Sequence, residues 1–398
     1  MSTQLDAGRS PGRQTNPVNA TPGAATRRVL MLNYEFPPLG GGAGNATRYL
    51  LREFARTGGL QVDLVTSSDG AFRVEEFAEG ITIHRVPVGK REFHHWRPLE
   101  LVRYSWRAYR YANRLLRESQ YDICHCWAGW PSGVIGHLLR ARVPYLVALR
   151  GSDVPGYSRR LAALDGLVFA PISRRVWSHA AAVVANSEDL GILAQDTRPT
   201  ELRVIPNGVD TDEFAPGGGE GATLRLLFVG RFVDRKNVPI VMRAVQALND
   251  VSLTLVGEGK RDAEWRQLAA ELRLGGRVRF VGHVAHEHLH QYYGEADVFV
   301  LPSEAEGMSN SLLEAMASGL AIVATDTGGA KGLVGSAGVI VPRGDEAALA
   351  AALEALVRDR GSVRRMKAEA RRLALTRTWR AVAAEYREVY ERVTSAGA

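Results

Sequence analysis

Short apolar runs alternate with helix-forming segments along most of the chain, and this alternation restricts the fold more than any other feature. RRVLMLN, VDLVTSS, YDICHCW, YLVALRG and AAVVANS each have the pattern of a buried strand that ends in polar residues or glycine. The segment GNATRYLLREFART, between the first two, has the pattern of a helix. Strands that alternate with helices predict a parallel sheet covered on both faces.

The stretch VIPNGVDTDEFAPGGGEGATLR interrupts this rhythm, because it is rich in glycine and proline and has no clear helical pattern. The alternation then restarts with RLLFVGRF, SLTLVGEG, RVRFVGH, DVFVLPS, AIVATDTG and GVIVPRG. A chain of 398 residues is also too long for one ordinary core. We therefore expect an α/β protein with two doubly wound, Rossmann-like parallel-sheet domains, residues 28–205 and 206–378, that bind ligands beyond the carboxyl ends of their strands.

The two ends of the chain differ from these domains. Residues 1–27 are rich in glycine, proline, serine and threonine and carry an excess of arginine, so we expect a disordered basic tail. The last stretch, TWRAVAAEYREVYERV, has apolar and aromatic residues at helical spacing, and residues 379–398 are expected to form an amphipathic helix.

Composition excludes several classes of protein. No window approaches about 18 uninterrupted apolar residues, and the first residues lack an apolar secretory core, so we expect a cytoplasmic protein without a membrane span. Cys124 and Cys126 lie two residues apart and have no second ligand pair for zinc, so we expect both to be reduced. The net charge of +7 suits anionic partners, but no nucleic-acid recognition module appears.

The glycine-rich stretch FPPLGGGAGNATRYL follows the first strand and precedes a helix for which Asn45 or Thr47 would be the cap. Gly41 and Gly42 would let the backbone approach a phosphate. The loop fits neither G-x-G-x-x-G, because Asn45 stands where the last glycine should be, nor the Walker loop, because no Lys-Ser or Lys-Thr follows. A flexible turn without a ligand is the alternative.

Two further loops carry charged residues at strand ends. In RGSDVPG, Arg150 and Asp153 either form a local ion pair or cap, or contact a substrate in the cleft between the domains. In VGRFVDRKNV, Arg231 and Lys236 follow the first strand of the second domain, where they either clamp a phosphate or belong to a solvated charge run. In GGRVRFVGHV, Val284 follows a later strand, where its backbone could form hydrogen bonds with the edge of a nucleobase.

The stretch EAEGMSNSLLEAMA places two glutamates around the start of a helix that Ser309 or Asn310 would cap. Glu306 and Glu314 would be about 12 Å apart if both were helical, too far for acid–base chemistry on one bond but a sensible span for a nucleotide sugar. Glu314 lies in an apolar run and needs a hydrogen-bonding partner. The free amides before the helix would face an anion; they belong to Gly307, Met308, Ser309 and Asn310.

Arginines repeat at spacings of four and three in RPLELVRYSWRAYRYANRLLR, so that they share one face of a predicted helix: Arg103, Arg107, Arg110, Arg114 and Arg117. Such a face is either simply solvated or contacts anionic lipid headgroups.

Taken in order and spacing, these motifs resemble the retaining glycosyltransferases of family 4, which have the GT-B fold. The resemblance extends over residues 28–394. EGMSNSLLEAMASGLAIVATDTGG is similar to the family's E-x7-E signature, VGRF with Lys236 to its donor-phosphate clamp, and IPNGVD to its interdomain segment. It implies two domains that face each other across a cleft, with the C-terminal helix crossing back onto the N-terminal domain.

The resemblance also implies a reaction and roles for residues. The enzyme would move a sugar from a UDP- or GDP-sugar to a glycan, lipid-linked or small-molecule acceptor, in cell-surface polysaccharide or glycolipid synthesis, without a metal or other cofactor. Arg231 and Lys236 would hold the diphosphate, Glu314 the ribose and Glu306 the sugar. Gly41, Gly42 and Val284 would line the donor. The catalytic candidates are Arg231, Lys236, Glu306 and Asp153.

Two departures and two alternatives stay open. Many relatives carry histidine at the position of Arg150 and glutamate at that of Gly332, so contacts there must differ in this chain. One alternative is another enzyme on the same fold: a nucleotide-sugar epimerase, which would consume its substrate without an acceptor, or a phosphorylase, which would need a further phosphate or cofactor site. A catalytically silent nucleotide-sugar-binding protein is the other alternative, although Arg231, Lys236, Glu306 and Glu314 are all present.

Overall fold

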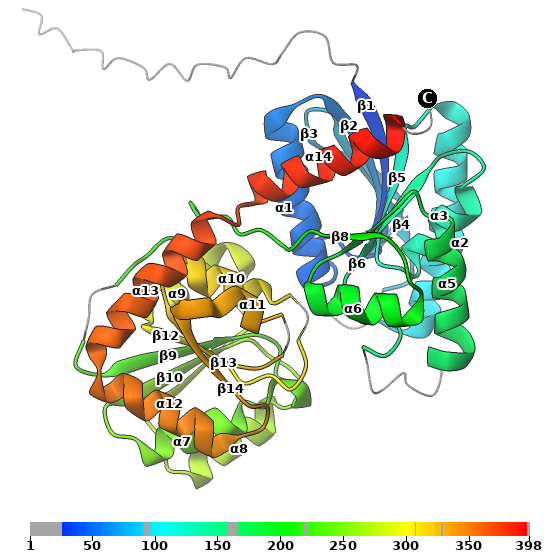
Figure 1. The fold of residues 1–398 in the computed structure, drawn as a ribbon. Helices are drawn as coiled ribbons and strands as arrows, with labels where there is room; N and C mark the ends of the chain where they lie inside the picture. Colours follow the sequence, from blue (N-terminus) through cyan, green and yellow to red (C-terminus); the bar gives the residue numbers. More distant parts are fainter. Residues whose placement is uncertain are drawn as a thin grey trace, which may run out of the picture.

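The computed structural model describes residues 26–90, 96–157, 165–218, 221–306, 308–327 and 329–395. The chain forms two α/β domains that lie side by side (Figure 1). Each is built on one twisted sheet with helices on both faces, which confirms the predicted pair of doubly wound domains. Most of the predicted basic tail, residues 1–25, lies outside the described residues.

The N-terminal sheet has eight strands in the order β3-β4-β2-β1-β5-β6-β7-β8. Neighbours pair in parallel except β3 and β4, which form an antiparallel hairpin around Glu79 and Gly80 at the edge of the sheet. This hairpin corrects the prediction of an entirely parallel arrangement. The strands are β1 (Arg27–Leu32), β2 (Leu60–Ser68), β3 (Arg73–Ala78), β4 (Ile81–Pro87), β5 (Ile123–Trp127), β6 (Tyr145–Leu149), β7 (Ala182–Ala185) and β8 (Leu202–Val204).

Helices cover both faces of this sheet and enclose two separate apolar cores. One core lies between the sheet and the helices α1 (Gly42–Thr57) and α14 (Trp379–Ser395). The other lies under α2 (Pro98–Glu118), α3 (Ser132–Leu139), α5 (Ala170–Ser178), which follows a π-helical turn η2 (Asp165–Phe169), and α6 (Glu188–Thr197). Cys124 and Cys126 are buried and free in this second core, as predicted.

The C-terminal sheet is parallel throughout, with six strands in the order β11-β10-β9-β12-β13-β14. These are β9 (Leu224–Val229), β10 (Val251–Val256), β11 (Val278–Gly282), β12 (Val298–Leu301), β13 (Ala321–Thr325) and β14 (Gly338–Val341). Its helices are α7 (Pro239–Ala247), α8 (Asp262–Glu271), α9 (Leu289–Glu295), α10 (Asn310–Ala317), α11 (Lys331–Val334), α12 (Glu346–Arg358) and α13 (Arg360–Leu375). Single 3-10 turns are η3 (Asp234–Lys236), η4 (His286–His288) and η5 (Gly335–Ala337).

The chain crosses between the domains twice, and the two crossings lie against each other. The amide of Val209, in the outward crossing, donates to the carbonyl of Arg377 in the return crossing at 2.9 Å. Gly208 is required here, since a Cβ on it would lie 2.5 Å from the backbone nitrogen of Trp379. After this point α14 runs back over the N-terminal domain (Figure 1). Its residues Tyr386 and Tyr390 are buried in the core between α14 and the sheet.

In each sheet the strand order reverses next to the first strand of the domain. In the N-terminal sheet, β1 stands between β2 and β5, and the glycine-rich loop follows β1. In the C-terminal sheet, β9 stands between β10 and β12. The loops after β9 and β12 carry the Arg231–Lys236 and Glu306–Asn310 segments, so both reach the crevice where doubly wound sheets bind ligands. Within the described residues, none of the helices has the length and apolar character to cross a membrane.

Candidate active site

Lys236 and Glu306 meet at the carboxyl edge of the C-terminal sheet. Lys236 ends the turn η3 after β9, and Glu306 lies in the loop after β12. The ammonium nitrogen Nζ of Lys236 donates to Oε2 of Glu306 at 2.5 Å, and Lys236 is almost fully buried. Within this buried ion pair, each group stabilises the charge of the other.

Several cations act on the Glu306 carboxylate. Burial by itself would raise the pKa of Glu306, but the positive charges of Lys236, Arg235 and Arg231 outweigh burial and lower it. Glu306 therefore stays ionised, and the three cations that stabilise its charge lie on the neighbouring loop after β9. Arg231, whose side chain is exposed toward solvent, is one of these cations.

The helix α10 begins beside this pair without a side-chain cap. Ser309 stands at the N-cap position, as predicted, but its hydroxyl lies 3.0 Å from the hydroxyl of Ser311 and caps no backbone amide. The first amides of α10 therefore keep their capacity to bind an anion, and the helix dipole favours one there. Met308 is half-buried against the neighbouring apolar core, whereas Gly307 lies outside the described residues.

Glu314, one turn further along α10, has the partners that its apolar surroundings demand. Oε1 lies 2.9 Å from Nε2 of His286, and Oε2 accepts from the hydroxyl of Tyr293 at 2.8 Å. Each carboxylate oxygen has a second lone pair, so Glu314 can accept further hydrogen bonds from a ligand. Val284, which precedes η4, is half-buried against the same apolar core.

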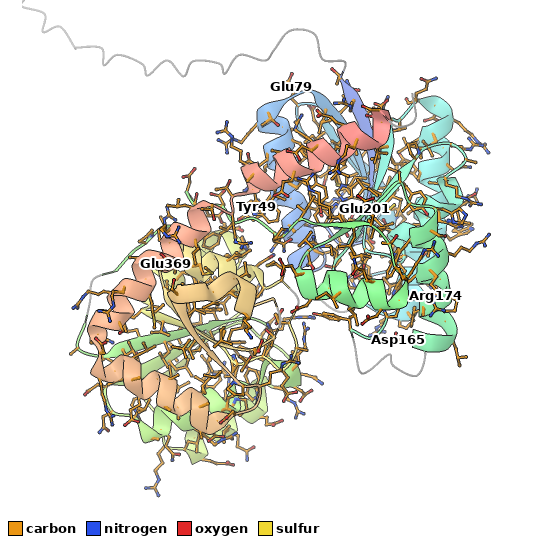
Figure 2. All side chains as sticks on the ribbon, in the orientation of Figure 1. Tyr49, Glu79, Asp165, Arg174, Glu201 and Glu369 are labelled. Carbon is orange, nitrogen blue, oxygen red and sulfur yellow. The ribbon has the colours of Figure 1, made fainter. Side chains whose placement is uncertain are left out.

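His286 connects Glu314 with the other domain. Its Nδ1 lies 3.4 Å from the hydroxyl of Tyr49 on α1, and that hydroxyl donates to Oε2 of Glu213 at 2.7 Å. Figure 2 shows Tyr49 at the junction between the two domains. These groups line a pocket of about 400 Å³, so solvent reaches the imidazole.

A second chain of hydrogen bonds crosses the cleft at the start of α10. The side-chain amide of Asn310 donates to the carbonyl of Gly42 at 3.2 Å and accepts from the amide of Asn207 at 2.6 Å. The guanidinium of Arg150 donates in turn to Oδ1 of Asn207 at 2.6 Å. The contact brings the glycine-rich loop of the N-terminal domain to the start of α10.

The glycine-rich loop turns directly into α1, whose N-cap is Gly41. The prediction of Asn45 or Thr47 as the cap is wrong, because both lie inside the helix and Thr47 bonds back to the carbonyl of Ala43. The amide of Gly41 donates to Oε2 of Glu35 at 3.1 Å. Burial raises the pKa of Glu35, although the Gly41 amide and the charge of Arg231 oppose this.

Both carboxylate oxygens of Asp153 already accept hydrogen bonds from backbone amides of nearby loops. Its two oxygens accept from the amides of Gly129, Arg150 and Gly151 at 2.6, 2.9 and 2.7 Å. Burial raises the pKa of Asp153 in spite of these bonds. The local ion pair considered from the sequence is absent among the described residues, because the Arg150 guanidinium lies over the ring of Trp127, 4.4 Å from its centroid, and contacts Asn207. A catalytic role for Asp153 stays a prediction.

Two family profiles match the chain along most of its length. The profile described as a glycosyl transferase 4-like domain matches residues 41–208, and the profile of glycosyl transferases group 1 matches residues 223–359. The D-inositol 3-phosphate glycosyltransferase of Geodermatophilus obscurus is 31% identical over 417 residues, which cover 89% of this chain and 87% of the relative. The chain is a family 4 glycosyltransferase.

Solved structures agree with the GT-B arrangement of this glycosyltransferase. The sucrose-phosphate synthase from Thermosynechococcus elongatus superimposes with a TM-score of 0.81 at 24% identity, covering 93% of this chain and all of that one. The Anabaena protein HepE in complex with UDP-glucose gives a TM-score of 0.71 at 20% identity, covering 92% of this chain and 99% of that one. The profiles and the relative confirm the family that the motifs indicated, and the solved structures confirm the fold.

The motifs did not reveal every residue that the glycosyltransferase places around this cleft. His286, Tyr293 and Asn207 carry the hydrogen bonds described above, and only Asn207 lies within a motif that had been singled out, IPNGVD. In the described part of the chain, no group of three or more histidine, cysteine, aspartate or glutamate side chains has the geometry of a metal site.

Proposed function

We propose that this glycosyltransferase moves a hexose from a nucleoside-diphosphate sugar to an acceptor hydroxyl with retention of the anomeric configuration. One observation carries the proposal: Lys236, Arg231 and the uncapped start of α10 lie around one edge of the C-terminal sheet, opposite the glycine-rich loop that Asn310 contacts. A ligand between them would face the two cations and the free amides of α10 on one side and the glycine-rich loop on the other.

The donor diphosphate is assigned to Arg231, Lys236 and the first amides of α10. Lys236 is already paired with Glu306, so an incoming diphosphate would share or take over its ammonium group. Breaking the bond between the sugar and the diphosphate leaves negative charge on the leaving phosphate, and fixed cations in a closed cleft stabilise that charge in the transition state. The proposal includes neither a metal nor another cofactor.

The two ends of the donor are assigned to the ends of the E-x7-E segment. Glu314 accepts hydrogen bonds from the ribose hydroxyls, with His286 and Tyr293 holding its carboxylate in place. Val284 flanks the base. Glu306, released from Lys236 by the diphosphate, faces the sugar together with the amides from Gly307 to Asn310, and Gly41 and Gly42 approach from the other domain.

In the reaction, the bond from the anomeric carbon to the phosphate oxygen breaks with its electrons passing to the diphosphate. The acceptor oxygen forms its new bond on the same face of the sugar, and its proton passes to the departing phosphate oxygen. No enzyme nucleophile takes part. Closing of the two domains over the donor excludes water, which would otherwise hydrolyse it.

The acceptor is assigned to the N-terminal domain, where Arg150 and Asp153 border the cleft. The relative from Geodermatophilus obscurus is named for a phosphorylated small molecule, D-inositol 3-phosphate. For this chain we propose a glycan, lipid-linked or small-molecule acceptor in the synthesis of cell-surface polysaccharide or glycolipid, with a UDP- or GDP-sugar as donor.

A donor screen followed by product analysis tests the proposal. UDP-, GDP- and ADP-sugars are compared by thermal shift, because a bound donor raises the unfolding midpoint by mass action. The best donor is then incubated with acceptors in the presence of EDTA, and NMR of the product gives the anomeric configuration. Retention with undiminished turnover supports the proposal. Inversion, conversion of the donor without any acceptor, or binding without turnover would contradict it.

A further inference from the structure

Five of the exposed large apolar side chains of the N-terminal domain lie on α2 and on the neighbouring β3–β4 hairpin and the loop before it. On α2, Leu99, Val102 and Trp106 are 57%, 62% and 57% exposed. Their spacing of three and four places them in one row along the helix. On the neighbouring hairpin strand, Val74 is also exposed, and Phe72 lies just before that strand and contacts the ring of Tyr111 on α2. Apolar groups of this size in contact with water mark a surface that binds a partner.

Arginines continue this row toward the end of α2. Arg110 and Arg117 follow Trp106 on the outer face of α2, and the Arg110 guanidinium lies over the Trp106 ring at 4.9 Å from its centroid. Neither Arg110 nor Arg117 forms an ion pair with a carboxylate among the described residues, whereas Arg114 pairs with Glu118. With five arginines against two glutamates, α2 carries a net charge of +3.

A groove runs beside this row. It has a volume of about 710 Å³ and is lined on the side of α2 by Trp106, Arg107, Arg110, Arg114 and Arg117, with Phe72 on the side of the hairpin. Arg107 donates to the carbonyl of Pro87 at 2.5 Å, which holds that wall in place. The groove is large enough for a phosphate-bearing headgroup, and its guanidinium groups match phosphate oxygens.

The inner face of α2 fixes the helix, so its outer face can serve as a binding surface without unfolding. Tyr104, Ala108 and Ala112 are fully buried under it, and the hydroxyl of Tyr104 donates to the carbonyl of Val65 on β2 at 3.0 Å. At its start, the side chain of Glu100 accepts from the amide of Arg97, and Pro98 occupies the first turn.

We propose that the outer face of α2 and the adjoining groove dock the enzyme on an anionic lipid bilayer. Leu99, Val102 and Trp106 enter the interface between headgroups and acyl chains, while Arg110, Arg117 and the groove bind headgroup phosphates. A soluble anion would use the arginines but would leave the exposed apolar row without a function, so the observations favour a bilayer. This proposal is independent of the donor and acceptor assignments, because binding to a surface requires no turnover.

Vesicle flotation tests the proposal with the full chain. The protein is mixed at low salt with vesicles of phosphatidylcholine alone or with added phosphatidylglycerol. We expect co-flotation only with the anionic vesicles, and less of it as salt rises. Because each basic residue near an anionic surface contributes about fivefold in partition, the double variant Arg110→Gln/Arg117→Gln should bind about 25-fold more weakly. Leu99→Ala/Trp106→Ala should lose about tenfold or more.

The control makes the same charge change on the other domain. Arg358→Gln/Arg372→Gln alters exposed arginines of α12 and α13, and it should bind anionic vesicles as the parent protein does. Every variant should retain the parent's thermal unfolding midpoint, which separates lost docking from lost folding. Absence of binding by the parent protein would overturn the proposal, as would binding that survives in both α2 variants. Loss in the arginine variant alone, together with competition by inorganic phosphate, would show a soluble-anion site instead and would also overturn it.

Discussion

His286 is surrounded by groups that set its charge. Glu314 from α10, Glu213 from the first interdomain crossing, and Tyr49 and Arg48 from α1 all face its ring. Burial would lower the pKa of His286, but the hydrogen bond and charge of Glu314 and the charge of Glu213 outweigh burial and raise it. The folded protein therefore holds the imidazolium form more tightly than the unfolded chain does.

The raised pKa of His286 in the folded protein predicts how the substitution His286→Gln changes stability with pH. Since the folded pKa lies above the unfolded value of about 6.5, the stabilisation is complete below about pH 6.5 and is lost as pH rises through the folded pKa. At about pH 5.5 the variant should lose about 2 kcal/mol, because a hydrogen bond to a charged group is removed. At about pH 9 the loss should be smaller. Urea unfolding of the parent protein and of His286→Gln at the two pH values measures the loss in free energy of unfolding. An equal loss at both pH values would contradict the raised pKa of His286.

Glu314 shows how far a single residue can be interpreted from the sequence. An acid inside the run LLEAMA was expected to need hydrogen-bonding partners, and the structure supplies two. Those partners, His286 and Tyr293, are 28 and 21 residues away along the chain. No periodicity links positions so far apart, so only the folding of α9 and η4 beside α10 could identify them.

At the scale of elements, α10 and the glycine-rich loop are joined by one side chain. Asn310 holds the carbonyl of Gly42 and the amide of Asn207, so it contacts the other domain and the crossing segment at once. Separation of the domains would break the bond between Asn310 and Gly42, whereas bonds within each domain would remain.

Removal of this side chain should therefore affect closure rather than folding. With Asn310→Ala, two hydrogen bonds of about 1 kcal/mol each are lost, and we expect donor affinity to fall by about tenfold or more. The unfolding midpoint should change little. Donor titration followed by thermal shift measures the affinity. Ser311→Ala is the matched control, because the Ser311 hydroxyl lies 3.0 Å from that of Ser309 and makes no contact with the N-terminal domain among the described residues. Unchanged donor affinity in Asn310→Ala would show that the contact has no part in binding.

Helices and strands with a strong apolar pattern were predictable from the sequence, whereas a weakly apolar edge hairpin and the start of a helix were not. The buried strands and α1 lie where the apolar runs place them, because strand burial follows directly from local apolar sequence. The β3–β4 hairpin was missed, since its strand RVEEFA is only partly buried and its apolar signal is weak. The start of α1 was missed because Gly41 serves as N-cap without the usual side-chain signal.

At the scale of the whole molecule, two chain crossings connect the domains, and α14 follows the second crossing back onto the N-terminal domain. Trp379, the first residue of α14, stacks on Tyr49 with ring centroids 5.7 Å apart, next to the Glu213 and His286 contacts. The order of the domains and the presence of a final helix followed from the sequence. The contacts between the crossings did not, because they join Gly208 and Val209 to residues near position 378, and nothing local marks that pairing.

The central claim is that the edge of the C-terminal sheet around Lys236 binds the leaving diphosphate of a nucleotide-sugar donor. Turnover by Lys236→Ala with the donor selected by the thermal-shift screen tests it most directly. Lys260→Ala is the control, since this exposed lysine of the same domain pairs with Asp234 and with no other carboxylate among the described residues. Loss of about 3 kcal/mol of transition-state stabilisation predicts turnover lower by about two orders of magnitude in Lys236→Ala, with folding intact. Near-parental turnover in a folded Lys236→Ala would contradict the account.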